Sequence, residues 1–263
     1  MRPVLCGVLL ISWLMLAQSV PQSPFDGVWK AEPTETDTPT EPEVYLLQDG
    51  TYRCPTCDPP LDIRADGLDQ KITGEPCYDT VSLQVVDGRT TLETDKRSGK
   101  TVGTSEMTVS SDGSSATLDW TESCNLNGDV VSETFILSRV AKGPRGSHAV
   151  SGSWQIVKRV NMSENAMVAT LKLEGDTFSF SDPTGQGYTA KLDGTETPIK
   201  GDLSNTMVSV KRIGENTIEE TDKHDGKVVE VIRFTPSADG KTMTISVENK
   251  VKGETRQFVA HKQ

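Results

Sequence analysis

The sequence predicts an all-β protein built from two tandem antiparallel up-and-down β-barrels of about 8–10 strands each. Three observations support this fold class. The chain repeats itself, short runs of alternating polar and apolar residues fill both copies, and turns containing glycine separate those runs. Self-similarity over so long a period indicates two copies of one domain.

The first 19 residues have the features of a signal peptide. Arg2 supplies a positive charge, and the apolar run from Val4 to Ala17 is too short for a membrane span. Small residues at Ala17 and Ser19 predict cleavage after Ser19, with an uncleaved anchor as the alternative. The mature protein, residues 20–263, is expected to be exported to the periplasm or the extracellular space, without a stable membrane span.

The repeat is clearest in ten residues that occur twice. Residues 93–102 read ETDKRSGKTV, and residues 220–229 read ETDKHDGKVV, an offset of 127. The offset stays at 125 to 127 until the last strand, where an insertion within residues 119–134 reduces it to 123. The repeat predicts a first barrel over residues 20–142, a linker over 143–149 and a second barrel over 150–263.

About ten strands are expected in the first copy. In chain order they are residues 28–31, 44–48, 51–54, 61–65, 68–73, 80–86, 90–96, 100–110, 116–123 and 133–140. Every second connection contains Asp-Gly, which tolerates the positive φ of tight hairpins: Asp49-Gly50, Asp66-Gly67, Asp87-Gly88 and Asp112-Gly113. Since alternate connections of a meander lie at one end, each barrel should have a tight end and an elaborated end with longer loops.

Acidic charge is concentrated in the first copy. Residues 20–149 carry 11 basic and 22 acidic side chains, whereas residues 150–263 carry 15 and 16. This excess argues against nucleic acid or anionic lipid as a partner, and solubility explains it more simply than cation binding. The acidic segment 32–43 is expected at the elaborated end of the first barrel; its carboxylates include Glu35, Asp37, Glu41 and Glu43.

Four cysteines follow the signal peptide, and all lie in the first copy: Cys54, Cys57, Cys77 and Cys124. Their even number in an exported chain favours two disulfides; a four-cysteine zinc site and a C-x-x-C redox centre are the alternatives. The connections that carry them belong to the elaborated end. The expected pattern joins Cys54 or Cys57 to Cys77, and a second bridge completes the set with Cys124.

No catalytic signature is present. His148, His224 and His261 have no Ser, Cys or carboxylate at a suggestive spacing. Metalloprotease, nucleophile-elbow, phosphate-loop and dinucleotide motifs are absent from the sequence. We therefore expect no enzymatic activity, no catalytic residue, no resident metal and no cofactor. A hydrolase whose paired carboxylates meet only in space is the alternative.

A Gly-x-Trp sequence enters the first strand of each copy, as GVW at 27–29 and GSW at 152–154. With the meander that follows, it resembles the lipocalin and fatty-acid-binding protein superfamily, and more closely the lipocalin-like domains of exported bacterial proteins. The resemblance implies that each Trp packs across a barrel base beneath a basic residue of the last strand. The residues in these positions are Trp29, Trp154, Arg139 and Lys262.

The same resemblance implies a non-enzymatic protein that holds a small, partly apolar ligand in one or both barrels. The later lipocalin motifs are missing, so no specific ligand is implied. The alternative is a structural or protein-interaction module of the cell envelope whose barrels are filled by side chains. Interior volume separates the two, because small inward side chains leave a cavity and bulky ones fill it.

Overall fold

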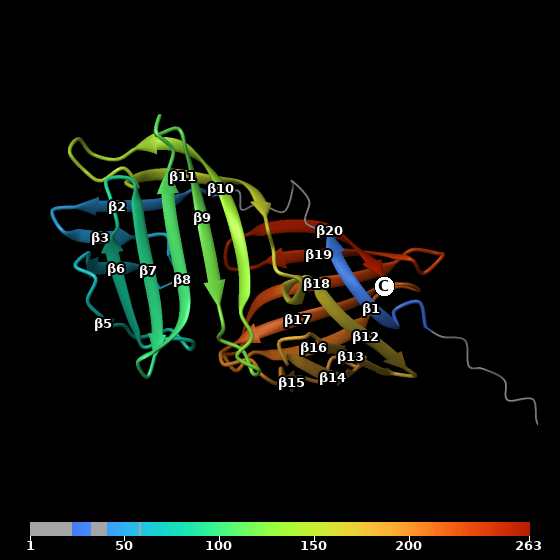
Figure 1. Cartoon of the computed structure of the whole chain (residues 1–263). Helices are drawn as coiled ribbons and strands as arrows, with labels where there is room; N and C mark the ends of the chain where they lie inside the picture. The colour runs from blue at the N-terminus through green and yellow to red at the C-terminus, as the bar shows by residue number, and fades with distance from the viewer. Residues whose placement is uncertain (1–22, 33–40, 58) are drawn as a thin grey trace, which may run out of the picture.

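The structure is a computed structural model that describes residues 23–32, 41–57 and 59–263. The predicted signal peptide, Glu35 and Asp37 lie outside these residues. Strands dominate the described chain, whose single short helical turn, η1, spans Glu164–Ala166. The predicted all-β fold class is confirmed: two nearly closed, barrel-shaped antiparallel sheets contain ten strands each (Figure 1).

The first barrel has the strand order β4-β3-β2-β11-β10-β9-β8-β7-β6-β5. Its strands are β2 (Glu43–Gln48), β3 (Thr51–Cys54), β4 (Leu61–Arg64), β5 (Gln70–Lys71), β6 (Thr80–Val85), β7 (Thr90–Arg97), β8 (Lys100–Val109), β9 (Ser115–Glu122), β10 (Val131–Lys142) and β11 (Gly152–Val160). Alternate side chains point inward, as the two-residue period of a strand requires, and Leu83, Met107 and Trp154 are among those that form the core.

The second barrel has the strand order β14-β13-β12-β1-β20-β19-β18-β17-β16-β15. Its strands are β1 (Gly27–Glu32), β12 (Val168–Glu174), β13 (Thr177–Ser181), β14 (Gly187–Lys191), β15 (Thr197–Pro198), β16 (Met207–Arg212), β17 (Ile218–His224), β18 (Lys227–Pro236), β19 (Thr242–Asn249) and β20 (Glu254–Lys262). Trp29, Phe178 and Phe234 belong to its core.

The first strand of each repeat lies in the barrel of the other repeat. β1 pairs with β12 and β20, and in Figure 1 it is the blue strand beside the red β20. β11 pairs with β10 and β2. The sheets therefore do not follow the predicted boundaries. Residues 43–160 form the first barrel without interruption, and residues 168–262 form the second together with residues 27–32.

The predicted linker 143–149 is a packed turn that leads β10 directly into β11. The backbone N–H of His148 donates to the carbonyl of Leu47 at 2.9 Å, which ties the turn to β2. At the start of β11, Gly152 has φ of 142°, and an added Cβ would lie 2.3 Å from the carbonyl oxygen of Ala141. Only glycine permits this close return of the chain, which keeps β11 with the first barrel.

A buried tryptophan forms the base of each barrel. The indole N–H of Trp29 donates to the carbonyl of Phe25, and that of Trp154 donates to the carbonyl of Val150, both at 2.8 Å. All four residues are almost fully buried. The same contact over the same four-residue spacing shows that the Gly-x-Trp motif builds the same base twice.

A basic side chain covers each tryptophan. The strand exchange determines which basic residue lies over which tryptophan. The Arg139 guanidinium lies 3.8 Å from the centroid of the Trp154 ring, and the Lys262 ammonium lies 4.9 Å from that of Trp29. Each basic residue thus stacks on the Trp of the other repeat. Arg139 also donates to the carbonyls of Ser151 and Ala149, at 2.7 Å each, so it fixes the packed turn as well.

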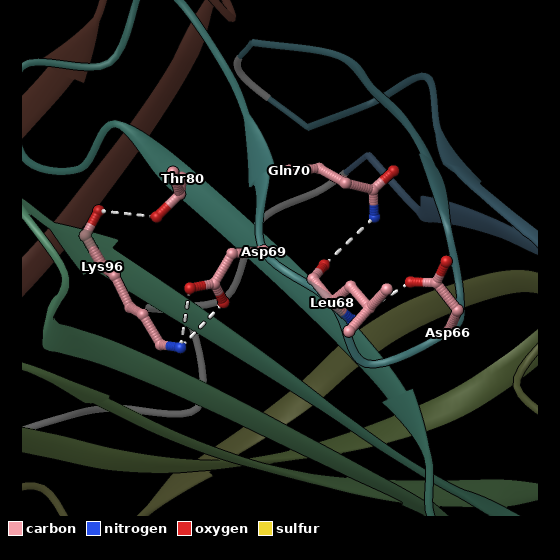
Figure 2. Close-up of polar contacts among 6 residues, drawn as sticks. All are labelled: Asp66, Leu68, Asp69, Gln70, Thr80 and Lys96. Atoms are coloured by element: carbon pink, nitrogen blue, oxygen red, sulfur yellow. Dashed lines mark hydrogen bonds and ion pairs between the residues drawn. The ribbon is translucent and has the colours of Figure 1, made fainter.

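The lysine of the repeated ETDK sequence helps to close each barrel at the seam between the first and last strands of the sheet. Lys96 on β7 donates to both carboxylate oxygens of Asp69, at 2.7 and 2.9 Å, in the connection from β4 to β5 (Figure 2). Lys223 reaches Glu196 at 2.5 Å in the second barrel. After the lysine, each ten-residue copy forms a tight turn that leads to the next strand. Residues of this turn have positive φ, such as Ser98 and Asp225.

The connection around Asp69 is itself held by local hydrogen bonds. Figure 2 shows the Leu68 N–H donating to Asp66 at 3.0 Å and the Gln70 amide donating to the carbonyl of Leu68 at 3.4 Å. The N–H of Gly67 donates to the carbonyl of Leu83 on β6 at 2.9 Å. The seam is therefore bridged by turn contacts instead of a full strand ladder.

Replacement of the two buried tryptophans tests the strand exchange. Trp29→Ala should lower the free energy of unfolding by about 3–5 kcal/mol, because it empties a buried site. Hydrogen exchange measured by mass spectrometry should then accelerate in β12 and β20. Trp154→Ala is the matched control and should accelerate exchange in β2 and β10. Faster exchange in β2 and β10 for Trp29→Ala would contradict the exchanged pairing.

Candidate functional site

The two barrels share a backbone plan but enclose different volumes. The second barrel contains a cavity of about 340 Å³. The cavity in the first barrel is about 110 Å³. The larger cavity is the candidate functional site, since binding sites for small molecules are concave, mostly apolar and preformed.

Apolar side chains make most of the wall of the larger cavity. Trp29 of the exchanged strand β1 lies at its base, together with Ala169 and Leu171 of the neighbouring strand β12. Strands β18 to β20 contribute the opposite wall, which includes Ile232, Ile245 and Phe258. The strand exchange therefore contributes directly to the cavity.

The rim of the larger cavity is polar and touches the first barrel. Asn165, Asp182, Thr184 and Gln186 line it. Asn165 Nδ2 donates to the carbonyl of Val130 at 3.0 Å, in the loop that follows β9. The insertion that distinguishes the first repeat thus packs against the mouth of the second barrel.

A second group of contacts strengthens this junction. The Asn127 side chain donates to the carbonyl of Pro183 at 2.9 Å, and the Ser132 N–H donates to the hydroxyl of Ser163 at 3.0 Å. Val131, between the two barrels, lines the cavity. Loops from both halves therefore define the entrance.

Equivalent inward positions explain part of the difference in volume. At three places the first barrel carries the larger side chain: Tyr45 against Leu171, Trp120 against Val247, and Leu137 against Ala260. The sequence reading did not identify the cavity residues. A comparison of the repeats would not have found them either, because other inward pairs differ in the opposite direction, such as Ser105 against Ile232 and Ala116 against Met243.

The smaller cavity is lined by a mixture of aromatic, apolar and polar groups. The Tyr45 and Tyr52 rings stack with centroids 6.2 Å apart and an interplanar angle of 16°. Glu93, from the first ETDK sequence, lines the same cavity. Burial, and then the charge of Asp95, raises the pKa of Glu93 to about 8.

Further carboxylates lie between this cavity and the Cys77–Cys124 disulfide. Burial, followed by the charges of Glu75 and Glu122, raises the pKa of Asp95 to about 6. Asp95 and Glu122 flank Gly103 in the sheet register, and the missing side chain of Gly103 leaves room for Asp95. One carboxylate oxygen of Asp95, Oδ1, is buried without a hydrogen-bond partner.

The second barrel repeats this acidic arrangement. Glu220 and Asp222 correspond to Glu93 and Asp95, and both are buried. Burial and then the Asp222 charge hold the pKa of Glu220 well above its ordinary value, although it accepts a hydrogen bond from the Tyr188 hydroxyl. Burial, followed by the Glu230 charge, raises the pKa of Asp222 to about 7. The inward Glu-x-Asp pair is therefore a property of the fold in both halves.

The four cysteines form two disulfides, so the predicted number is confirmed. The pairs are Cys54–Cys57 and Cys77–Cys124, with Cα atoms 5.4 and 5.6 Å apart. The expected link between the C-P-T-C pair and Cys77 is wrong. The tight turn after β3 brings Cys54 and Cys57 within bridging distance of each other, which leaves Cys77 to pair with Cys124.

One group of three metal-ligand side chains converges in the described part of the chain. It consists of Cys77, Glu122 and Cys124. Both sulfur atoms belong to a disulfide. Because zinc binds thiolates and not disulfide sulfur, the oxidised protein offers this group no thiolate ligand.

The three histidines are dispersed. His148 Nε2 lies 2.6 Å from the carbonyl oxygen of Asp87 in the packed turn. His224 and His261 lie 3.6 and 3.4 Å from the surface carboxylates of Asp225 and Glu32. The structure does not bring them together with each other or with the cavities.

No protein-family model, curated protein or solved structure matches this chain. Within the described residues, no helix has the length and apolar character needed to cross a membrane. The two disulfides indicate that the protein folds in an oxidising compartment.

Removal of each disulfide should have a different effect on stability. Replacing Cys77 and Cys124 by Ala should lower the free energy of unfolding by about 4 kcal/mol, because the bridge closes a long loop in the unfolded chain. Replacing Cys54 and Cys57 should lower it by about 2 kcal/mol, because that loop is short. Chemical denaturation measures both, and equal losses would contradict this assignment.

Stability should also depend on pH through the buried carboxyl groups. The pKa of Glu93 is about 8 in the folded protein against an ordinary 4.5, so the folded state holds more protons than the unfolded state between these values. The free energy of unfolding should therefore fall as pH rises from about 4.5 to 8. Glu93→Gln should flatten this slope in denaturation curves, whereas the exposed Glu106→Gln should preserve it. An unchanged slope in Glu93→Gln would refute the assignment.

Proposed function

We propose that this protein is an exported binding protein whose second barrel holds a small, mostly apolar molecule. The cavity of about 340 Å³ carries the proposal. Its volume falls within the range of roughly 300–1,000 Å³ that is typical of small-molecule sites. The barrel, the Gly-x-Trp base and the basic residue over each Trp support a lipocalin-like type of domain.

The lining defines the class of ligand. Its deep wall consists of aliphatic and aromatic side chains such as Leu171, Ile245 and Phe258, which favour a hydrocarbon body. The rim offers amide and hydroxyl groups on Asn165 and Thr184, which suit one polar end. The favoured ligand is therefore amphipathic, with its apolar part against Trp29. Disulfide formation supports a periplasmic or extracellular site of action.

The alternative function, an envelope module with filled barrels, is supported by one observation. The first barrel encloses only about 110 Å³, because side chains such as Tyr45 and Tyr52 occupy much of its interior. This half is therefore too full for a ligand of the size that the second barrel accepts. The two functions differ in what they predict for the second barrel.

Native mass spectrometry of the mature protein from its own source provides the first test. A co-purifying apolar molecule should appear as added mass. As a defined probe, 1-decanol should quench or shift tryptophan fluorescence saturably, because Trp29 lines the cavity. Ala169→Leu should weaken decanol binding about tenfold or more, since the added methyl groups occupy the ligand's space.

Thr170→Leu is the matched control. It lies on the same strand, adds a comparable apolar side chain on the exposed face, and should bind decanol as the unmodified protein does. Thermal melts of both variants check that the fold is retained. The proposal fails if the unmodified protein shows neither added mass nor saturable decanol binding, or if Ala169→Leu binds normally.

A further inference from the structure

We propose that the first barrel binds a small organic ammonium ion in the cavity bounded by Glu93, Tyr45 and Tyr52. This site is separate from the apolar cavity of the second barrel, so the proposal does not depend on the function proposed above.

The volume of the first cavity limits the size of the ion. It measures about 110 Å³. An apolar protein cavity of about 150 Å³ accommodates benzene, which has six heavy atoms. A guest of about five heavy atoms is therefore the appropriate size, as in tetramethylammonium.

The lining has the chemistry that recognises an ammonium group. Aromatic ring faces attract cations, and Tyr45 and Tyr52 contribute two stacked rings. Leu83, Met107 and Leu118 supply apolar contacts for alkyl groups. Glu93 supplies a carboxyl group that makes no hydrogen bond or ion pair with any described residue. A cationic guest would provide the missing counter-charge.

The charged groups around Glu93 also favour binding of a cation. The charged groups that act on Glu93 and Asp95 are carboxylates: Asp95 acts on Glu93, and Glu75 and Glu122 act on Asp95. No basic side chain is among the groups that shift the pKa of Glu93 or of Asp95. In the second barrel, by contrast, Arg256 partly compensates Glu230. The carboxylates next to Glu93 therefore favour a positively charged guest in the first cavity.

The geometry favours an organic ion over a metal ion. Hard metal ions such as Ca²⁺ take six to eight oxygen ligands close together. Among the described residues, the one converging group of three candidate ligands contains the Cys77–Cys124 disulfide, and Glu93 does not belong to it. One carboxylate with two aromatic rings instead matches a diffuse cation that needs no inner coordination shell.

Binding should be linked to proton release. Glu93 has to ionise to pair with the guest, and its pKa is about 8 without one. The groups that face the site from neighbouring elements are Asp95 on β7, Glu43 and Tyr45 on β2, Tyr52 on β3, and Tyr78 in the connection from β5 to β6, whose pKa burial also raises. Burial, and then carboxylate charges, hold the pKa of Tyr45 and Tyr52 above the ordinary value, so they stay neutral below pH 9. Affinity should therefore rise with pH from 6 to 9, with Glu93 as the titrating group.

Isothermal titration calorimetry of the oxidised, mature protein tests the proposal with tetramethylammonium chloride. Saturable binding to one site is expected, with heats in buffers of different ionisation enthalpy that report proton release near pH 7. tert-Butanol, a neutral molecule of similar size, should bind at least about tenfold more weakly. Sodium chloride at the same ionic strength is the blank, and calcium chloride examines the metal alternative.

Three variants locate the site. Glu93→Gln should weaken tetramethylammonium binding about 30-fold or more and abolish proton release, since it removes the buried counter-charge. Tyr45→Leu copies the second barrel, where Leu171 occupies the equivalent position, and should weaken binding about three- to tenfold. Glu220→Gln is the equivalent change in the second barrel and should leave binding unaltered.

Several results would overturn the proposal. These are no saturable binding of tetramethylammonium, equal binding of tert-butanol, saturable binding of calcium alone, or an equal loss for Glu93→Gln and Glu220→Gln. A circular dichroism melt of each variant separates loss of the site from loss of the fold. Glutamine should preserve the fold at position 93, because its shape matches that of the protonated Glu93 side chain.

Discussion

The structure depends on one pairing: the first strand of each repeat is hydrogen-bonded to the last strand of the other. β1 carries Trp29 into the core of the second barrel, and β11 carries Trp154 into the core of the first. The largest side chain at each base is thus supplied from outside the repeat that surrounds it. Each repeat thus needs a strand of the other to complete its core, although the first barrel is continuous in the chain and only the second recruits a distant strand, β1.

On this shared frame the interiors have diverged. The ETDK sequences keep their structural tasks in both halves, since each lysine reaches the seam and each Glu-x-Asp pair faces inward. Side chains at other inward positions then decide what each barrel can hold. The first retains a small, acidic cavity with aromatic walls, and the second a larger, apolar one. The loop after β9 is longer than its counterpart after β19, and it links the halves at the larger opening.

Local features of the fold were readable from the sequence. Strand alternation and Asp-Gly turns act over a few residues, and Asp49 and Gly50 do take the positive φ that such turns require. The sequence did not predict which barrel the first strand of each repeat would join. The repeats are so similar that β1 satisfies either barrel equally well by pattern, and the packed turn at Gly152 decides the outcome through a close backbone contact. The disulfide pairing could not be predicted because it depends on distances between loops. The cavities could not be predicted because their volumes depend on the sum of many side-chain volumes.

The adjacency of the first and last described strands has a consequence for connectivity. β1 and β20 are neighbours, and the N–H of Gln263 donates to the carbonyl of Val28 at 2.9 Å. A circular permutant that joined these ends and opened the chain between β11 and β12 would thread the second barrel completely before the first. Every strand would keep its neighbours, yet no strand would be exchanged. The strand exchange therefore depends only on the order in which the chain connects the strands. The packing of the two barrels does not depend on that order.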